Sequence, residues 1–135
     1  MRGYVVGPQD GVEGYDPDVK ASAGSTGGAI TVMVATATEG GAPRHLHHRE
    51  DECFYVIDGT ISVEIDGERS EAGRGSFVFL PREVPHAWDV ESETASVMII
   101  TVPAGFEDFM RDWGRAEGDD RREIASRYGI ELLGS

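Results

Sequence analysis

His45-Leu46-His47-His48-Arg49-Glu50-Asp51-Glu52 is the stretch of sequence that decides the fold. Side chains two residues apart on a β-strand point to the same face, so His45 and His47 can bind one ion while Leu46 points away. Glu52 lies an odd number of residues from His47, so a loop or bulge over residues 48–51 must reset the alternation. The spacing predicts a mononuclear metal site.

The carboxylate of this site is open to two interpretations. Asp51 replaces Glu52 as the ligand if the bulge is placed differently, and the charged run taken alone is also typical of a solvated loop. His48 is out of phase with His47, so we expect it outside the site. Glu50 and Asp51 are otherwise expected as surface charges.

A fourth donor, His86, follows in the segment Pro81-Arg82-Glu83-Val84-Pro85-His86. Three imidazoles and a carboxylate inside a β-barrel would be costly to desolvate unless a cation binds them. Imidazole donors favour a divalent transition metal (Fe, Ni, Mn, Cu or Zn) over Mg or Ca, and the residue types do not select among these metals.

These two segments resemble the motifs of the cupin superfamily, specifically small single-domain members similar to quercetin dioxygenases. The first motif, G(X)5HXH(X)3-4E(X)6G, is matched at His45, His47, Glu52 and Gly59, and the second, G(X)5PXG(X)2H(X)3N, at Gly75, Pro81 and His86. The departures are Glu39 at the opening glycine, Glu83 at a glycine of the second motif and Val90 at its asparagine.

The resemblance implies an all-β jelly-roll barrel, a double-stranded β-helix with C-terminal helices. It assigns His45, His47, Glu52 and His86 as metal ligands, with Glu52 also serving as the base that accepts a substrate hydroxyl proton. It also implies a homodimer in which exposed sheet edges are covered.

A substrate pocket is expected beside the metal. Four side chains leave about two coordination positions open, as in catalytic sites. Continuing the strand alternation from His86 and from Glu52 places four apolar side chains on the inward face, namely Trp88, Val90, Phe54 and Val56. The alternative is that they are ordinary core, which we favour for Phe54 and Val56 and leave open for Trp88.

Composition limits the class of protein. A chain of 135 residues is the usual size of one domain, and its net charge of -13 would repel nucleic acids and anionic membranes, so a small molecule is the expected partner. No apolar stretch is long enough for a signal peptide or a membrane span. With one cysteine no intrachain disulfide forms, which suits the cytoplasm.

Short apolar runs with period two predict the barrel over residues 29–102, preceded by strands and loops in 1–28 and followed by a helical segment in 103–135. Expected strands are 29–37, 53–57, 60–65, 68–72, 77–80 and 95–102. Asp58-Gly59 and Asp66-Gly67 are expected as hairpin turns. Residues 77–80 are apolar on both faces, which favours a central strand.

The period changes after Pro103. Phe106, Phe109, Met110 and Trp113 form an apolar stripe at helical spacing that Gly114 would end, and a second helix is expected over 119–128. Such a stripe usually packs on the outside of a barrel. The alternative is a lid.

The function expected from these features is that of a metal-dependent cupin enzyme, a dioxygenase-like oxidoreductase acting on a small aromatic or enolisable compound. Similar ligand sets in the superfamily also serve isomerases, cyclases and lyases. A noncatalytic small-molecule-binding module is the competing class.

Overall fold

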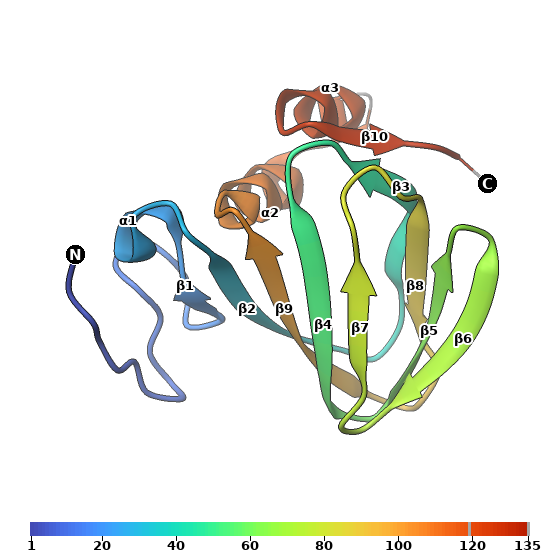
Figure 1. Ribbon diagram of the computed structural model, residues 1–135, viewed down its shortest axis with the longest axis horizontal. Helices are drawn as coiled ribbons and strands as arrows, with labels where there is room; N and C mark the ends of the chain where they lie inside the picture. Colours follow the sequence, from blue (N-terminus) through green and yellow to red (C-terminus); the bar gives the residue numbers. More distant parts are fainter. Residues whose placement is uncertain (119, 135) are drawn as a thin grey trace.

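Two five-stranded antiparallel sheets face each other in the computed structural model, which describes residues 1–118 and 120–134 (Figure 1). The strands are β1 (Val19–Ala21), β2 (Thr31–Ala37), β3 (Gly41–His47), β4 (Asp51–Asp58), β5 (Thr60–Ile65), β6 (Glu68–Gly73), β7 (Phe77–Leu80), β8 (His86–Val90), β9 (Ala95–Val102) and β10 (Ile130–Leu132). The first sheet has the order β1-β2-β9-β4-β7, and the second has the order β10-β3-β8-β5-β6.

The predicted jelly roll is confirmed. Along β9, every second residue is buried from Ala95 to Thr101, as expected for a strand with one face on a core. Apolar side chains from both sheets meet between them, including Phe54 and Val56 of β4 and Ile61 of β5. The alternation of apolar and polar residues in the sequence therefore identifies the side chains that lie on the inner face of each sheet.

The Asp58-Gly59 turn is not a hairpin, contrary to the prediction. β4 pairs with β7 and β9, whereas β5 pairs with β6 and β8, so this turn carries the chain from one sheet to the other. Gly59 has a φ of 79°, and a Cβ there would lie 2.2 Å from the Thr94 carbonyl oxygen. The Asp66-Gly67 hairpin is confirmed, since Ile65 pairs with Glu68 across it.

Strand β7 lies at the edge of its sheet and not at the centre as predicted. Phe77 is 64 % exposed and Phe79 is 50 % exposed, while Val78 and Leu80 face the core. The inner side of β7 is apolar because it packs on the core. Its outer side is apolar because it is part of a sheet face that no other element of the described chain covers.

The helices gather at one end of the barrel, together with β10 (Figure 1). A short helix α1 (Ala23–Thr26) precedes β2, and α2 (Phe106–Arg115) follows β9. Gly114 lies within α2 and does not end it. Helix α3 (Asp120–Arg127) matches the second predicted helix, whose expected first residue, Asp119, lies outside the described residues. Within the described part of the chain, no helix has the length and apolar character needed to cross a membrane.

Strand β10 was not predicted. It pairs with β3 in antiparallel register, with Ile130 opposite His47 and Leu132 opposite His45. The end of the chain thus covers the free edge of the strand that carries two of the histidines.

Helix α2 is fastened to the barrel by the buried carboxylate of Glu107. Its oxygens accept hydrogen bonds from the N–H groups of Ala23 (2.8 Å) and Gly105 (3.0 Å) and from the Thr31 hydroxyl. Burial raises the pKa of Glu107, but these hydrogen bonds together outweigh burial and lower its pKa below the usual value.

Candidate metal centre

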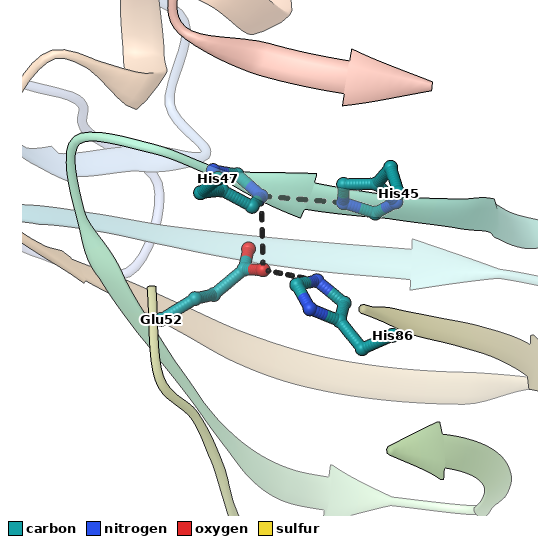
Figure 2. Close-up of side chains that lie close together, drawn as sticks. All are labelled: His45, His47, Glu52 and His86. Carbon is teal, nitrogen blue, oxygen red and sulfur yellow. Dashed lines mark hydrogen bonds and ion pairs between the residues drawn. The ribbon is translucent and has the colours of Figure 1, made fainter. Parts of the chain in front are cut away.

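His45, His47, Glu52 and His86 meet inside the barrel. One potential ligand atom from each lies within 4.8 Å of all the others, and the four side chains come from three strands (Figure 2). His45 and His47 share one face of β3, and His86 is the direct cross-strand partner of His45. Glu52 comes from β4 in the opposite sheet.

The change of alternation between His47 and Glu52 has a simple structural cause. β3 ends at His47 and β4 begins at Asp51, and the three residues between them carry the chain from the second sheet to the first. The predicted loop therefore lies within the expected range. Because the chain changes sheet there, Glu52 faces the histidines from across the barrel.

Each imidazole is oriented by a hydrogen bond at Nδ1. The Nδ1 atoms of His45 and His86 lie 2.6 Å and 3.3 Å from the carbonyl oxygens of Pro43 and Val84, and that of His47 lies 2.6 Å from Glu50 Oε1. Carbonyl and carboxylate oxygens only accept, so each Nδ1 donates. The Nε2 atoms are then left with free lone pairs, the arrangement usual for histidines that bind metals.

The free Nε2 atoms are crowded together. Those of His45 and His47 lie 3.2 Å apart, and Glu52 Oε1 lies 3.5 Å from His47 Nε2 and 3.2 Å from His86 Nε2. His86 Nε2 is buried without a hydrogen bond to any residue that the structure describes. Lone pairs facing one another in a buried site repel unless a cation lies between them, so the cluster fits a metal ion.

Burial keeps this cluster away from water. The four side chains are between 1 % and 8 % exposed. Burial is the main cause that lowers the pKa of His45 to about 4, and the neighbouring His86 and His47 lower it further against the opposing effects of Pro43 and Glu52. His45 is therefore neutral at physiological pH, the form that binds metals.

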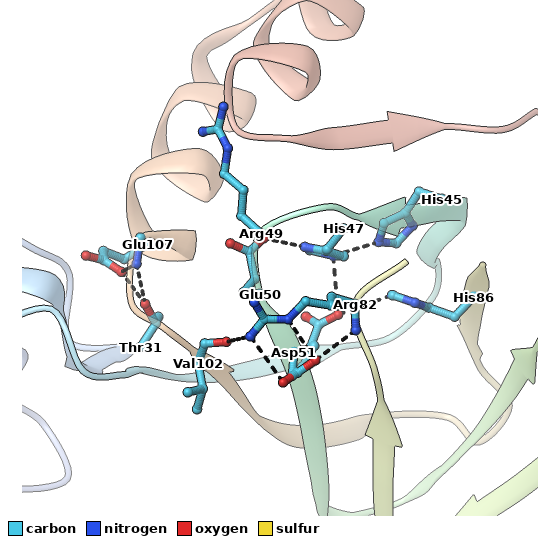
Figure 3. A network of polar contacts seen from close by, with 12 residues as sticks. Thr31, His45, His47, Arg49, Glu50, Asp51, Arg82, His86, Val102 and Glu107 are labelled. Carbon is cyan, nitrogen blue, oxygen red and sulfur yellow. Dashed lines mark hydrogen bonds and ion pairs between the residues drawn. The ribbon is translucent and has the colours of Figure 1, made fainter. Parts of the chain in front are cut away.

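Glu50 was expected on the surface, but it is only 7 % exposed and bonds to His47. The turn after β3 folds its side chain back under the imidazole (Figure 3). The sequence carries one hint of this contact, a carboxylate three residues after a candidate ligand. Nothing in its local pattern distinguishes Glu50 from Asp51.

Asp51, the alternative ligand, does not join the cluster. Its Oδ1 accepts hydrogen bonds from the backbone N–H (2.9 Å) and Nε (3.2 Å) of Arg82, as Figure 3 shows. Hydrogen bonds from Arg82 lower the pKa of Asp51. His48 also lies outside the cluster, exposed and 2.9 Å from Glu83 Oε2.

An apolar cavity of about 130 Å³ adjoins the cluster. It is lined by Gly41, Ala42, Pro43, His45, Glu52, Trp88, Ile99, Phe106, Phe109, Met110, Trp113, Ile130 and Leu132. Of the four residues expected in a substrate pocket, Trp88 lies in this wall. Phe54, Val56 and Val90 are absent from it, and Phe54 and Val56 are buried in the core.

The stripe of helix α2 faces this cavity. Phe106, Phe109, Met110 and Trp113 all line it, although stripes of this kind usually pack on the outside of a barrel. Helical spacing predicts that these four side chains share one face of α2. It does not predict whether that face packs outside the barrel or over its mouth, because this depends on how α2 folds back after β9.

Comparison with known proteins identifies the protein family. Residues 32–103 match the Cupin domain family, and the chain belongs to that family. Helix α2 and strand β10 lie beyond the matched residues.

The relatives share only parts of the chain. Quercetin 2,3-dioxygenase of Bacillus subtilis is 29% identical over 70 residues, which are 52% of this chain and only 21% of that enzyme. The structure of KdgF from Halomonas sp. matches with a TM-score of 0.57 and 21% identity, over 60% of this chain and 76% of that chain. Pac13, a nucleoside dehydratase, matches with a TM-score of 0.52 and 16% identity, over 58% of this chain and 62% of that chain. At these identities the structural matches establish the fold alone.

Proposed function

We propose that the protein is a metal-dependent enzyme, a dioxygenase-like oxidoreductase acting on a small aromatic or enolisable compound. The observation that carries the proposal is that three lone-pair Nε2 atoms and Glu52 converge at the wall of an apolar cavity. The partial likeness to quercetin 2,3-dioxygenase supports the choice of reaction.

His45, His47, Glu52 and His86 are the proposed ligands of one divalent transition metal (Fe, Ni, Mn, Cu or Zn). When bound, such a metal would supply Lewis-acid chemistry, and any of them except zinc would also supply redox chemistry, at coordination positions that the four side chains leave open. The hydrogen bonds at the three Nδ1 atoms fix the rings before the metal arrives, so little reorganisation accompanies binding.

Glu52 is the proposed catalytic base. It belongs to the cluster and also lines the cavity, so its carboxylate oxygen can accept a proton from a substrate hydroxyl group there. The apolar side chains around it exclude water, which keeps the proton between Glu52 and the substrate.

A second candidate needs no oxidant. Because Glu52 is placed to take a proton from a substrate and return it elsewhere, an enolisable compound could be isomerised, cyclised or cleaved at the same site. A redox-inert metal, such as zinc, in the purified protein would favour this candidate. A module that binds its ligand without reaction would show neither proton exchange nor oxygen uptake.

Metal analysis of protein purified without chelators is the first test. We expect about one transition-metal ion per chain, since the four side chains form one mononuclear site. His86→Ala should lose most of this metal, whereas the control His48→Ala should keep it because His48 lies outside the cluster. Equal metal content in His86→Ala and the wild type would remove His86 from the site.

Oxygen uptake is the second test. The metal-loaded protein is mixed anaerobically with flavonols, small β-diketones and single-ring phenols, and oxygen is then admitted. Consumption that disappears in Glu52→Gln supports the oxygenase. No consumption with any of these compounds, despite full metal content, would end the oxygenase proposal and leave proton-transfer chemistry.

The proposed assembly is a homodimer formed through the outer face of the first sheet. Apolar side chains lie side by side across its strands, where Tyr55 pairs with Phe77 and with Met98 and where Cys53 pairs with Phe79 and with Ile100. In a chain of net charge -13, an uncharged surface is where two copies approach with least repulsion. We call these six residues the outer patch.

A further inference from the structure

We propose that the cavity selects an uncharged ligand with a single ring, and that helix α2 and strand β10 set this selection. The inference rests on the proposed function, because both place the ligand beside the same four side chains. It concerns the size and charge of the ligand, which the metal ligands alone do not determine.

The lining shows which charge the cavity accepts. Of its thirteen residues, only His45 and Glu52 have ionisable side chains, and both belong to the metal cluster. Neither Lys nor Arg is among them. Away from the metal cluster, a carboxylate, phosphate or sugar would lose its hydration without gaining partners, so this part of the lining favours an uncharged apolar group.

The volume shows which size fits. The cavity measures about 130 Å³. A dry apolar cavity of about 150 Å³ binds one benzene molecule, and pockets for drug-sized ligands span roughly 300–1,000 Å³. One ring therefore fills this space, and the further rings of a flavonol would extend out of it.

Aromatic rings form the wall that a ligand ring would contact. On α2, the ring of Phe109 lies 5.5 Å from that of Phe106 and 5.5 Å from that of Trp113. The indole of Trp88 on β8 contributes a further ring and makes an edge contact with Phe54. Aromatic faces and edges at these separations favour another flat ring.

This wall is fixed in place. Glu107, at the flank of the stripe formed by residues 106, 109, 110 and 113, bonds α2 to Thr31 and to Ala23. β10 bonds to β3 and places Ile130 and Leu132 in the lining. Both elements lie outside residues 32–103, so six of the thirteen lining residues come from the part of this chain that the family match does not reach.

Tryptophan fluorescence gives a direct readout. The chain has two tryptophans, and both Trp88 and Trp113 line the cavity. Nitroaromatic compounds quench tryptophan on contact. Three of them form a matched set, since nitrobenzene has one ring, 1-nitronaphthalene has two rings and 4-nitrobenzoate has one ring with a negative charge.

The experiment titrates the full-length protein, as purified, with each compound. We expect saturable quenching by nitrobenzene, with apparent affinity at least tenfold higher than for 4-nitrobenzoate and for 1-nitronaphthalene. None of the three has a hydroxyl group to take part in the proposed reaction, and repeating the titration after the metal has been removed with a chelator shows whether the carboxylate of 4-nitrobenzoate binds a metal and not the cavity wall. Loss of oxygen uptake would therefore leave this inference intact.

Substitution at Trp113 tests the role of the helix. Trp113→Leu should raise the affinity for 1-nitronaphthalene about tenfold, reported by Trp88, because it enlarges the cavity. Tyr4→Ala, an exposed aromatic outside the lining, should leave the ranking unchanged. The ranking of the three compounds in the wild-type protein needs no substitution. Binding of 4-nitrobenzoate or 1-nitronaphthalene as tight as that of nitrobenzene would overturn the inference.

Discussion

At the scale of single residues, Glu50 completes the arrangement around His47. Its Oε1 accepts the Nδ1 hydrogen of His47 at 2.6 Å, in a buried position. A charged acceptor fixes the ring tautomer more firmly than a neutral one and makes Nε2 a better donor to a metal. Glu50 is thus a positioning residue for the proposed ligand.

Glu50→Gln should weaken metal binding by roughly tenfold, because loss of such a partner typically reduces metal affinity 10- to 100-fold. The affinity is measured by competition with a chromophoric chelator. Glu39→Gln is the matched control, since it makes the same change at an exposed position. Nitrogen NMR of the His47 ring provides a second readout, in which the Nδ1–H form should lose population. Unchanged affinity and tautomer would refute the role.

Glu83 occupies a position where the cupin motif has glycine, and its φ of 71° is in the left-handed region. The turn geometry is thus kept without the glycine. Its backbone N–H donates to the His47 carbonyl oxygen at 2.8 Å, which ties the turn before His86 to the first histidine strand.

Comparing Glu83→Gly with Glu83→Ala isolates this backbone strain, because both lose the contact with His48. The glycine variant should be more stable by about 1 kcal/mol, since a left-handed conformation costs other residues roughly 1–2 kcal/mol and the added freedom of the unfolded glycine offsets part of that. Urea denaturation measures the difference. Equal stability of the two variants would show that the turn is unstrained.

The clustered residues were predictable from the sequence because their signal is local. His45 and His47 follow the period of a strand, and the odd spacing to Glu52 required the break that the structure contains. Glu50 was not predictable, because a charged turn residue is buried only by the way the chain folds back after β3. The choice between Asp51 and Glu52 depended on the position of Arg82, which is distant in sequence.

At the scale of elements, helix α2 depends on Glu107. The carboxylate joins the helix to β2 and to the segment before it, and its lowered pKa shows that its ionised form is favoured in the folded state. A group whose pKa is lower in the folded than in the unfolded state adds stability above the unfolded value. That contribution is lost as the pH falls below about 4.5 and through the folded pKa.

Glu107→Gln should lower the free energy of unfolding by about 2 kcal/mol at pH 7, the usual size for hydrogen bonds to a charged group. The deficit relative to the wild type should shrink as the pH falls below 4.5, the usual pKa of the side chain. Chemical denaturation at several pH values measures both. The exposed Glu117→Gln serves as the control. A deficit that stayed constant with pH would contradict ionisation of Glu107 in the folded state.

The sequence patterns did not predict which strands share a sheet. Asp58-Gly59 has the composition of a hairpin turn, but the partners of β4 are distant in sequence, and the turn crosses between sheets. Apolar residues on both faces of β7 predict a strand buried on both sides, at the centre of a sheet. The same pattern also occurs on an edge strand whose outer face is uncovered, which is the position of β7. β10 has three residues, too few for a periodic signal.

At the scale of the whole molecule, the outer patch is an exposed apolar area on the first sheet. Exposed aromatic side chains lie on an edge strand and its neighbour, where Phe77, Phe79 and Tyr55 are 64 %, 50 % and 46 % exposed. Unpaired strand edges and contiguous apolar faces favour association with another chain.

Phe79→Glu should convert the proposed dimer to a monomer, because it places a charge in the middle of an apolar contact in both copies. Light scattering coupled to size exclusion measures the mass. Tyr4→Glu, at an exposed site outside the patch, should leave the dimer intact. A wild-type protein that elutes as a monomer at high micromolar concentration would disprove the assembly.

The cytoplasmic location inferred from the single cysteine stays a prediction.

The pairing of β10 with β3 has a consequence for the order in which the molecule matures. Until β10 has been synthesised, the strand bearing His45 and His47 has an unpaired edge on its β10 side. A nascent chain can pair the other strands of the barrel earlier, since they precede β10 in the sequence. Strand β3 therefore gains its second partner only after every other strand of the barrel has been synthesised.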